Sequence, residues 1–121
     1  MFQILPESEG NIIGLRAVGK LTDRDYREVL IPTLKELMNR DHGKIRLLCL
    51  MDEEFASVEA GAMWDDAKFF LLHKNDFEKM AIVGGPKWIE LIMRLFAPLM
   101  KGDVKTFSVN QLREAWDWIR S

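Results

Sequence analysis

The sequence predicts an α/β domain built on a mainly parallel sheet, and three observations lead to this fold class. Short apolar runs alternate with segments of helical periodicity in the order β-β-α-β-α-β-α-β-α. The run at residues 45–51 is almost entirely apolar, as expected of a central strand that is covered on both faces. Strand patterns at residues 2–5 and 12–18 flank the turn signal Gly10-Asn11 and therefore predict a hairpin with an antiparallel edge. Residues 1–121 have the length of a single domain.

Helix-start and helix-stop signals define the first two helices. Thr22 is placed to cap the first helix, and the acids that follow it favour the dipole of the first turn. Pro32 lies inside the helical pattern and should kink it, and Gly43 should end it. A second helix is expected over residues 58–73.

The C-terminal half repeats the alternation of strand and helix. A strand over residues 77–83 ends in two glycines, and Pro86 suits the first position of a third helix that continues towards Pro98. A short strand over residues 104–107 follows. Ser108 then opens the last helix with a capping box.

Charge and composition exclude several function classes. The net charge of −2 argues against a nucleic-acid partner. Cys49 has no disulfide partner and is expected to be a core thiol, and its spacing to His42 and His73 fits no metal site, so no metal or cofactor is expected. No signal peptide or membrane span is evident, so we expect a cytoplasmic protein for which peripheral contact with the inner face of the membrane stays open.

The third helix holds the most informative pattern. At 100° per residue its charges Lys87, Glu90, Arg94 and Lys101 share one narrow strip, which leaves an apolar arc of about 240°. A helix that packs on one side of a sheet needs an apolar stripe of little more than about 100°. The surplus must therefore be covered by neighbouring helices, by a second copy of the chain, or by lipid or an apolar ligand.

The candidate ligand-contacting or membrane-contacting residues come mainly from this arc. They share large or soft apolar side chains on the third helix, with one aromatic from the second: Trp88, Ile89, Ile92, Met93, Leu95, Phe96, Leu99, Met100 and Trp64.

An acidic cluster follows the central strand, at the sheet edge where ligands of open α/β folds bind. It comprises Asp52, Glu53, Glu54 and Glu59. Without a positioned partner these carboxylates are expected to form a solvated loop and to supply charge to a helix N-terminus. No residue is singled out as catalytic, and an enzyme is not expected.

The chain resembles the STAS domains, and more closely the SpoIIAA-like family of small bacterial proteins. The segments that carry the resemblance are residues 19–26, 30–32, 43–48, 64–69, 73–84, 87–89, 101–107 and 115–118. The resemblance implies a five-stranded mixed, mostly parallel sheet flanked by four helices, similar to the CRAL-TRIO lipid carriers. STAS regulators carry a phosphorylated Ser in an Asp-Ser-Ser/Thr-Gly motif. Here the corresponding stretch, residues 52–57, lacks that motif, and phosphorylation of Ser57 beside the acidic cluster is disfavoured.

Two functional hypotheses follow. In the first, the protein is a non-enzymatic module that binds an apolar small molecule or lipid and associates peripherally with a membrane through the third helix. In the second, it is a STAS-type regulatory module, comparable to an anti-anti-sigma factor, that acts as a homodimer or through a protein partner.

Overall fold

A five-stranded sheet forms the centre of the computed structural model, which describes residues 1–40 and 43–121. The strands lie in the order β1-β2-β4-β6-β7, and all neighbours are parallel except the hairpin pair β1–β2. Their bounds are Phe2–Ile4 (β1), Ile12–Ala17 (β2), Ile45–Met51 (β4), Phe77–Gly84 (β6) and Asp103–Phe107 (β7). The expected mostly parallel sheet with an antiparallel edge is confirmed.

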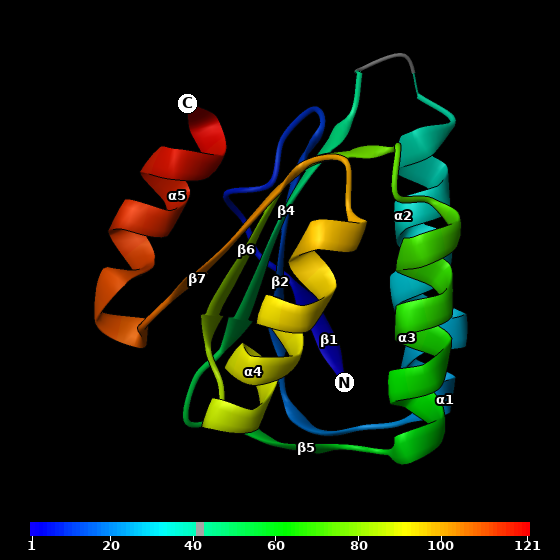
Figure 1. Ribbon diagram of the computed structural model, residues 1–121, viewed down its shortest axis with the longest axis vertical. Helices are drawn as coiled ribbons and strands as arrows, with labels where there is room; N and C mark the ends of the chain where they lie inside the picture. The colour runs from blue at the N-terminus through cyan, green and yellow to red at the C-terminus, as the bar shows by residue number, and fades with distance from the viewer. Residues whose placement is uncertain (41–42) are drawn as a thin grey trace.

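The helices divide between the two sides of the sheet (Figure 1). On one side, here the α4 side, lie α1, η1, α2, α3 and α4 with the short η2, and on the other, the α5 side, lies α5 after a 3-10 turn, η3. Their bounds are Asp23–Asp25 (α1), Tyr26–Leu30 (η1), Ile31–Met38 (α2), Ala60–Leu72 (α3), Lys87–Phe96 (α4), Ala97–Leu99 (η2), Val109–Gln111 (η3) and Leu112–Arg120 (α5).

Strand β4 shows how the sequence divides its side chains between the two sides. Ile45, Leu47 and Met51 belong to the core on the α4 side, while Leu48 and Leu50 belong to the core on the α5 side. This is the two-residue alternation of a strand, and both sets are apolar because both sides of the strand are covered. The central strand expected at residues 45–51 is confirmed.

The first helix differs in detail from the expectation. Thr22 caps it as expected, with Asp25 completing a capping box. Ahead of Pro32 the helix widens into the π-helical turn η1, in which the N–H of Ile31 bonds to the carbonyl of Tyr26. Pro32 has no N–H to donate to the helix. The wide turn directly before it is the helical irregularity that this proline was expected to cause.

The end of that helix was placed wrongly by the sequence. It ends at Met38, with Asn39 at its C-cap, and not at Gly43. The final turn tightens because the N–H of Asn39 contacts the carbonyls of both Lys35 and Glu36. His42 lies outside the described residues.

A second, two-stranded sheet corrects the expected start of the next helix. Strand β3 (Gly19–Leu21) pairs in parallel with β5 (Phe55–Val58), so Val58 is in a strand and α3 begins only at Ala60. The N–H of Glu59 donates to the carbonyl of Leu21 at 2.9 Å, which extends this pairing to the start of α3. Non-local pairing thus replaces the first two residues of the expected helix.

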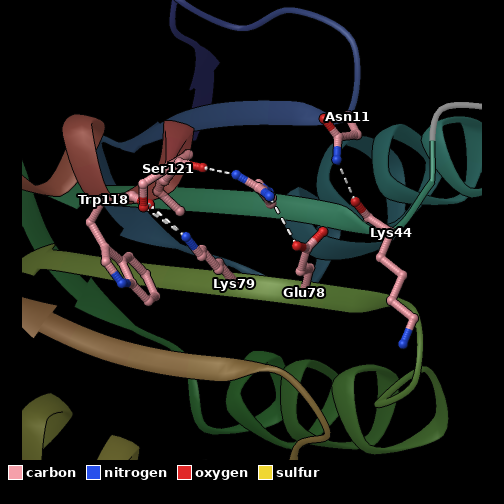
Figure 2. A network of polar contacts seen from close by, with 8 residues as sticks. Asn11, Lys44, Glu78, Lys79, Trp118 and Ser121 are labelled. Atoms are coloured by element: carbon pink, nitrogen blue, oxygen red, sulfur yellow. Dashed lines mark hydrogen bonds and ion pairs between the residues drawn. The ribbon is translucent and has the colours of Figure 1, made fainter.

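Helix α5 is fixed to the sheet through its C-terminal carbonyls. Lys79 Nζ donates to the Trp118 carbonyl at 2.9 Å, and Arg46 donates to the Ile119 carbonyl at 2.8 Å while pairing with Glu78 (Figure 2). Cationic side chains at a helix C-terminus satisfy free carbonyls and match the helix dipole. The capping box of Ser108 and Gln111 is present, although it opens the 3-10 turn that precedes α5.

Candidate ligand-binding cavity

A cavity of about 130 Å³ lies on the α4 side, between the sheet, the π-helical turn η1, α3 and α4. Most of its walls are apolar. Strands β2, β4 and β6 contribute Leu15, Leu47, Met51, Met80 and Ile82. Single residues of β1, β3 and β5 and the apolar side chains of the helices complete the wall. A concave apolar site with few polar groups is the usual form of a small-molecule site.

The start of α4 depends on a close contact between β6 and β4. Gly84 has a φ of +79°, and a Cβ at this position would collide with the carbonyl oxygen of Met51. Gly85 also has a positive φ, and Pro86 follows as the residue before the first helical turn. The two glycines therefore let the chain turn tightly and lay α4 across the end of the cavity.

The apolar arc of α4 has two parts. Five of the predicted ligand-contacting residues line the cavity: Trp88, Ile89, Ile92, Met93 and Phe96. Ile89 is buried, whereas Trp88 is 41% exposed and therefore stands at the rim. Neighbouring elements of the same chain cover this part of the arc.

The other part of the arc is exposed. Leu91, Leu95 and Leu99 are 59%, 74% and 54% exposed, and we call these three residues the outer leucines. The charged strip of α4 is also exposed, with Arg94 paired to Glu90 at 3.4 Å. The helix thus carries both a cavity wall and an apolar surface.

The remaining two candidates lie elsewhere. Met100 is buried in the core on the α4 side. Trp64 is 72% exposed on α3 and borders a separate open hollow with Asp23, Arg27 and Glu59. The structure therefore does not bring Trp64 to the cavity.

Three side chains of the cavity wall can gain or lose a proton: Tyr26 from η1, Cys49 from β4 and Asp66 from α3. Burial raises the pKa of Asp66 to about 7. Burial, with the nearby Asp66 charge, raises the pKa of Cys49 to about 12 and raises that of Tyr26 as well. Among the described residues, no hydrogen bond or ion pair stabilises the Asp66 carboxylate.

Asp66 is the residue that sequence reasoning missed. Its neighbours along the inner face of α3 are Met63, Ala67 and Phe70, which also line the cavity. Residues at these spacings share one helical face, so an acid within an apolar stripe was the signal available in the sequence. Cys49 was expected to be a core thiol, and it is a free thiol in the cavity wall.

The acidic cluster at the end of β4 lies apart from the cavity. Asp52 accepts hydrogen bonds from Arg16 at 2.9 Å and from the N–H of Glu54. Partial burial alone would raise the pKa of Asp52, but these hydrogen bonds outweigh it and lower the pKa. Glu59 accepts from the N–H of Asp23 near the start of α1, whereas Glu53 and Glu54 are exposed. Ser57 lies within β5.

No helix in the described part of the chain is long and apolar enough to span a bilayer. The cavity and the outer leucines, which lie on α4 and the following turn η2, are the two apolar features described above.

The sheet order and the helix arrangement are those of a STAS-type module. A model of the SpoIIAA-like family matches residues 12–120, and the chain belongs to this family. The five-stranded sheet with four flanking helical segments agrees with this assignment.

A solved structure supports the assignment. It is an uncharacterized protein from Shewanella loihica PV-4, of the DUF3478 family and with a SpoIIAA-like fold. The two chains are 28% identical, with a TM-score of 0.74, over 98% of this chain and 92% of the other. A search of curated proteins finds no match.

Proposed function

We propose that this protein is a non-catalytic module that binds an apolar small molecule or lipid in the cavity beneath α4 and touches a membrane surface through the outer leucines. The observation that carries the proposal is the apolar cavity with Trp88 at its rim. Its volume of about 130 Å³ is close to that of an engineered apolar cavity, about 150 Å³, that binds benzene. Unfilled apolar space costs stability, and a ligand that fills it recovers lost contacts.

The non-catalytic part of the proposal is supported by the isolation of Asp66. General acid–base chemistry needs a carboxyl group held in a fixed orientation towards a substrate proton. Among the described residues, neither a hydrogen bond nor an ion pair orients the Asp66 carboxyl group. Tyr26 and Cys49 are the other titratable groups of the described cavity wall, and burial keeps both in their protonated forms.

A cavity-filling substitution tests ligand binding. Toluene is the probe, and binding is followed by NMR titration of the full chain. Wild type is expected to show saturable shifts, and Ile92→Trp, which fills the cavity, is expected to lose them. The matched control is Leu91→Trp, because Leu91 is the adjacent residue but is 59% exposed. Absence of saturable shifts in wild type, or equal binding by Ile92→Trp, would contradict the proposal.

Membrane contact is supported by the combination of exposed leucines and exposed cations on α4. Apolar side chains enter the interface while cations meet anionic headgroups, and Lys87 and Arg94 are both exposed beside the outer leucines. Wild type is expected to float with phosphatidylglycerol vesicles, and Leu95→Glu is expected to remain in the dense fraction. Ile4→Glu is the control, because Ile4 is 57% exposed on the edge strand β1. Failure of wild type to float rejects membrane contact.

The same outer leucines favour a second candidate function, that of a STAS-type interaction module. A second copy of the chain or a regulatory protein would then cover Leu91, Leu95 and Leu99. Sedimentation velocity tests whether a second copy of the chain covers these leucines. A wild-type dimer that Leu95→Glu converts to a monomer supports the dimer, and a wild-type monomer at high concentration counts against it.

A further inference from the structure

The Asp66 carboxyl group is the feature of the cavity that an apolar ligand alone does not explain. It belongs to the inner face of α3 and lies in the cavity wall between Met63 and Phe70. Among the described residues of that wall there is no Lys, Arg or His. The Asp66 side chain is half-buried, so an ionised carboxylate here keeps only part of its hydration and has an electrostatic requirement for a cation that the described wall does not meet.

The groups facing Asp66 from the surrounding elements do not meet this requirement. The turn η1 supplies the phenol of Tyr26 and β4 supplies the thiol of Cys49. Burial raises the pKa of both groups, so both stay neutral through pH 8. Helix α4 presents only uncharged side chains to the cavity. Asp66 is therefore the group in this wall that changes charge between pH 5 and pH 8.

We infer that the cavity selects a small apolar amine, whose ammonium group pairs with the Asp66 carboxylate while its hydrocarbon part fills the space between α4 and the sheet. This inference rests on the proposed function and names the ligand class of the same cavity. An ammonium group supplies the missing countercharge and hydrogen-bond donors together, and such charge-assisted bonds are the strong ones. A ligand with a carboxylate or phosphate head would instead meet a like charge with no cation in the described wall to offset it.

The cavity volume sets the size of the ligand. About 130 Å³ accommodates a benzene-sized group, since an engineered cavity of about 150 Å³ holds benzene. Benzylamine, benzyl alcohol, benzoate and toluene share this apolar part and differ in charge and hydrogen-bonding capacity. They form a matched series for the test.

The experiment measures binding of these four probes to the full chain by NMR titration at pH 8 and pH 5.5. Two variants accompany wild type. Asp66→Asn removes the carboxylate from the cavity, and Asp65→Asn removes a carboxylate from the adjacent residue, which borders the separate hollow near Trp64. Toluene reports whether the cavity itself is intact in each variant.

Benzylamine is expected to bind wild type and Asp65→Asn with the highest affinity of the series at pH 8. Asp66→Asn should bind it at least about tenfold more weakly, the usual loss for a charge-assisted hydrogen bond. At pH 5.5 wild type should also lose about tenfold or more, because Asp66, with a pKa near 7, is then mostly protonated. Toluene should still bind saturably to all three proteins, which shows that the cavity is intact in each.

Three results would overturn the inference: equal binding of benzylamine by wild type and Asp66→Asn, tighter binding of benzoate or benzyl alcohol than of benzylamine at pH 8, or no weakening at pH 5.5. If toluene still binds in these cases, the apolar cavity stands and only the choice of amine fails. If wild type binds neither toluene nor benzylamine, the proposed function fails together with the inference.

Discussion

The indole ring of Trp116 on α5 lies directly against the backbone of Gly14 on β2. A Cβ at residue 14 would be 2.5 Å from Cη2 of Trp116 and 2.9 Å from its Cζ2. Trp116 is 5% exposed and is one of the residues that form the core on the α5 side. The absence of a side chain at Gly14 is therefore what allows α5 to pack closely on the sheet.

Gly14→Ala is expected to destabilise the protein by about 1–3 kcal/mol, the usual cost of overpacking a core. Chemical denaturation with urea measures this as a lower midpoint. Gly61→Ala is the control. Gly61 lies in the first turn of α3 with no atom within 4 Å of an added Cβ, so alanine should be neutral or stabilise by up to about 1 kcal/mol. An unchanged midpoint for Gly14→Ala would show that Trp116 moves aside freely.

Asp66 should make the stability of the protein fall as pH rises. Its pKa is raised to about 7, so between about pH 4 and pH 7 the folded state binds more protons than the unfolded state. The free energy of unfolding then falls by up to about 1.4 kcal/mol per pH unit over that window. Urea denaturation of wild type and Asp66→Asn from pH 4 to pH 8 isolates this contribution. The stability of Asp66→Asn relative to wild type should increase with pH up to about pH 7. A stability difference that does not change with pH would reject this contribution of Asp66.

Cys49 should react slowly in the folded protein. Burial raises its pKa to about 12, and the thiolate is the form that alkylating reagents attack. Mass spectrometry after iodoacetamide treatment at pH 8 should show almost no modification of native protein and full modification in urea. The result is unambiguous because the chain has a single cysteine. Rapid labelling of the native protein would mean that the cavity opens widely to reagent.

Lys79 should stabilise α5 more than Lys105 does. Both ammonium groups lie over the Trp118 ring, at 5.2 and 5.3 Å, but Lys79 also donates to the Trp118 carbonyl. Lys79→Met is expected to cost about 1–2 kcal/mol, which combines a charge-assisted hydrogen bond and a helix-end charge, and Lys105→Met about half that or less. Amide hydrogen exchange in α5 should accelerate for Lys79→Met. Equal effects of the two substitutions would indicate that the cation–π contacts dominate.

The main sheet could be predicted from the sequence because its signals are local. The almost continuous apolar pattern of β4 and the glycine turn before β2 act within a few residues. Strand β5 could not be predicted in this way. Phe55–Val58 is stabilised by pairing with β3, whose residues lie more than thirty positions earlier in the chain.

The candidate site was predictable in part for a similar reason. Helical periodicity separated the charged strip of α4 from its apolar arc, but periodicity does not say which part of an arc faces its own sheet. The division between cavity residues such as Ile92 and exposed residues such as Leu95 depends on where α3 and η1 lie. Asp66 was missed because it stands beside another acid, Asp65, and the sequence alone did not show which of the two adjacent carboxylates faces the sheet.

The alternation of β4 and β6 between the two sides of the sheet has a consequence for how the cavity can be reshaped. The cavity borders Leu47, Met80 and Ile82, whereas Leu48, Ala81 and Val83 face α5. Consecutive residues of one strand therefore belong to different cores, and a substitution at a cavity residue leaves the side chains that face α5 in place. Leu47, Met80 and Ile82 are themselves buried in the core on the α4 side, so the same side chains set both the packing beneath α4 and the shape of the cavity.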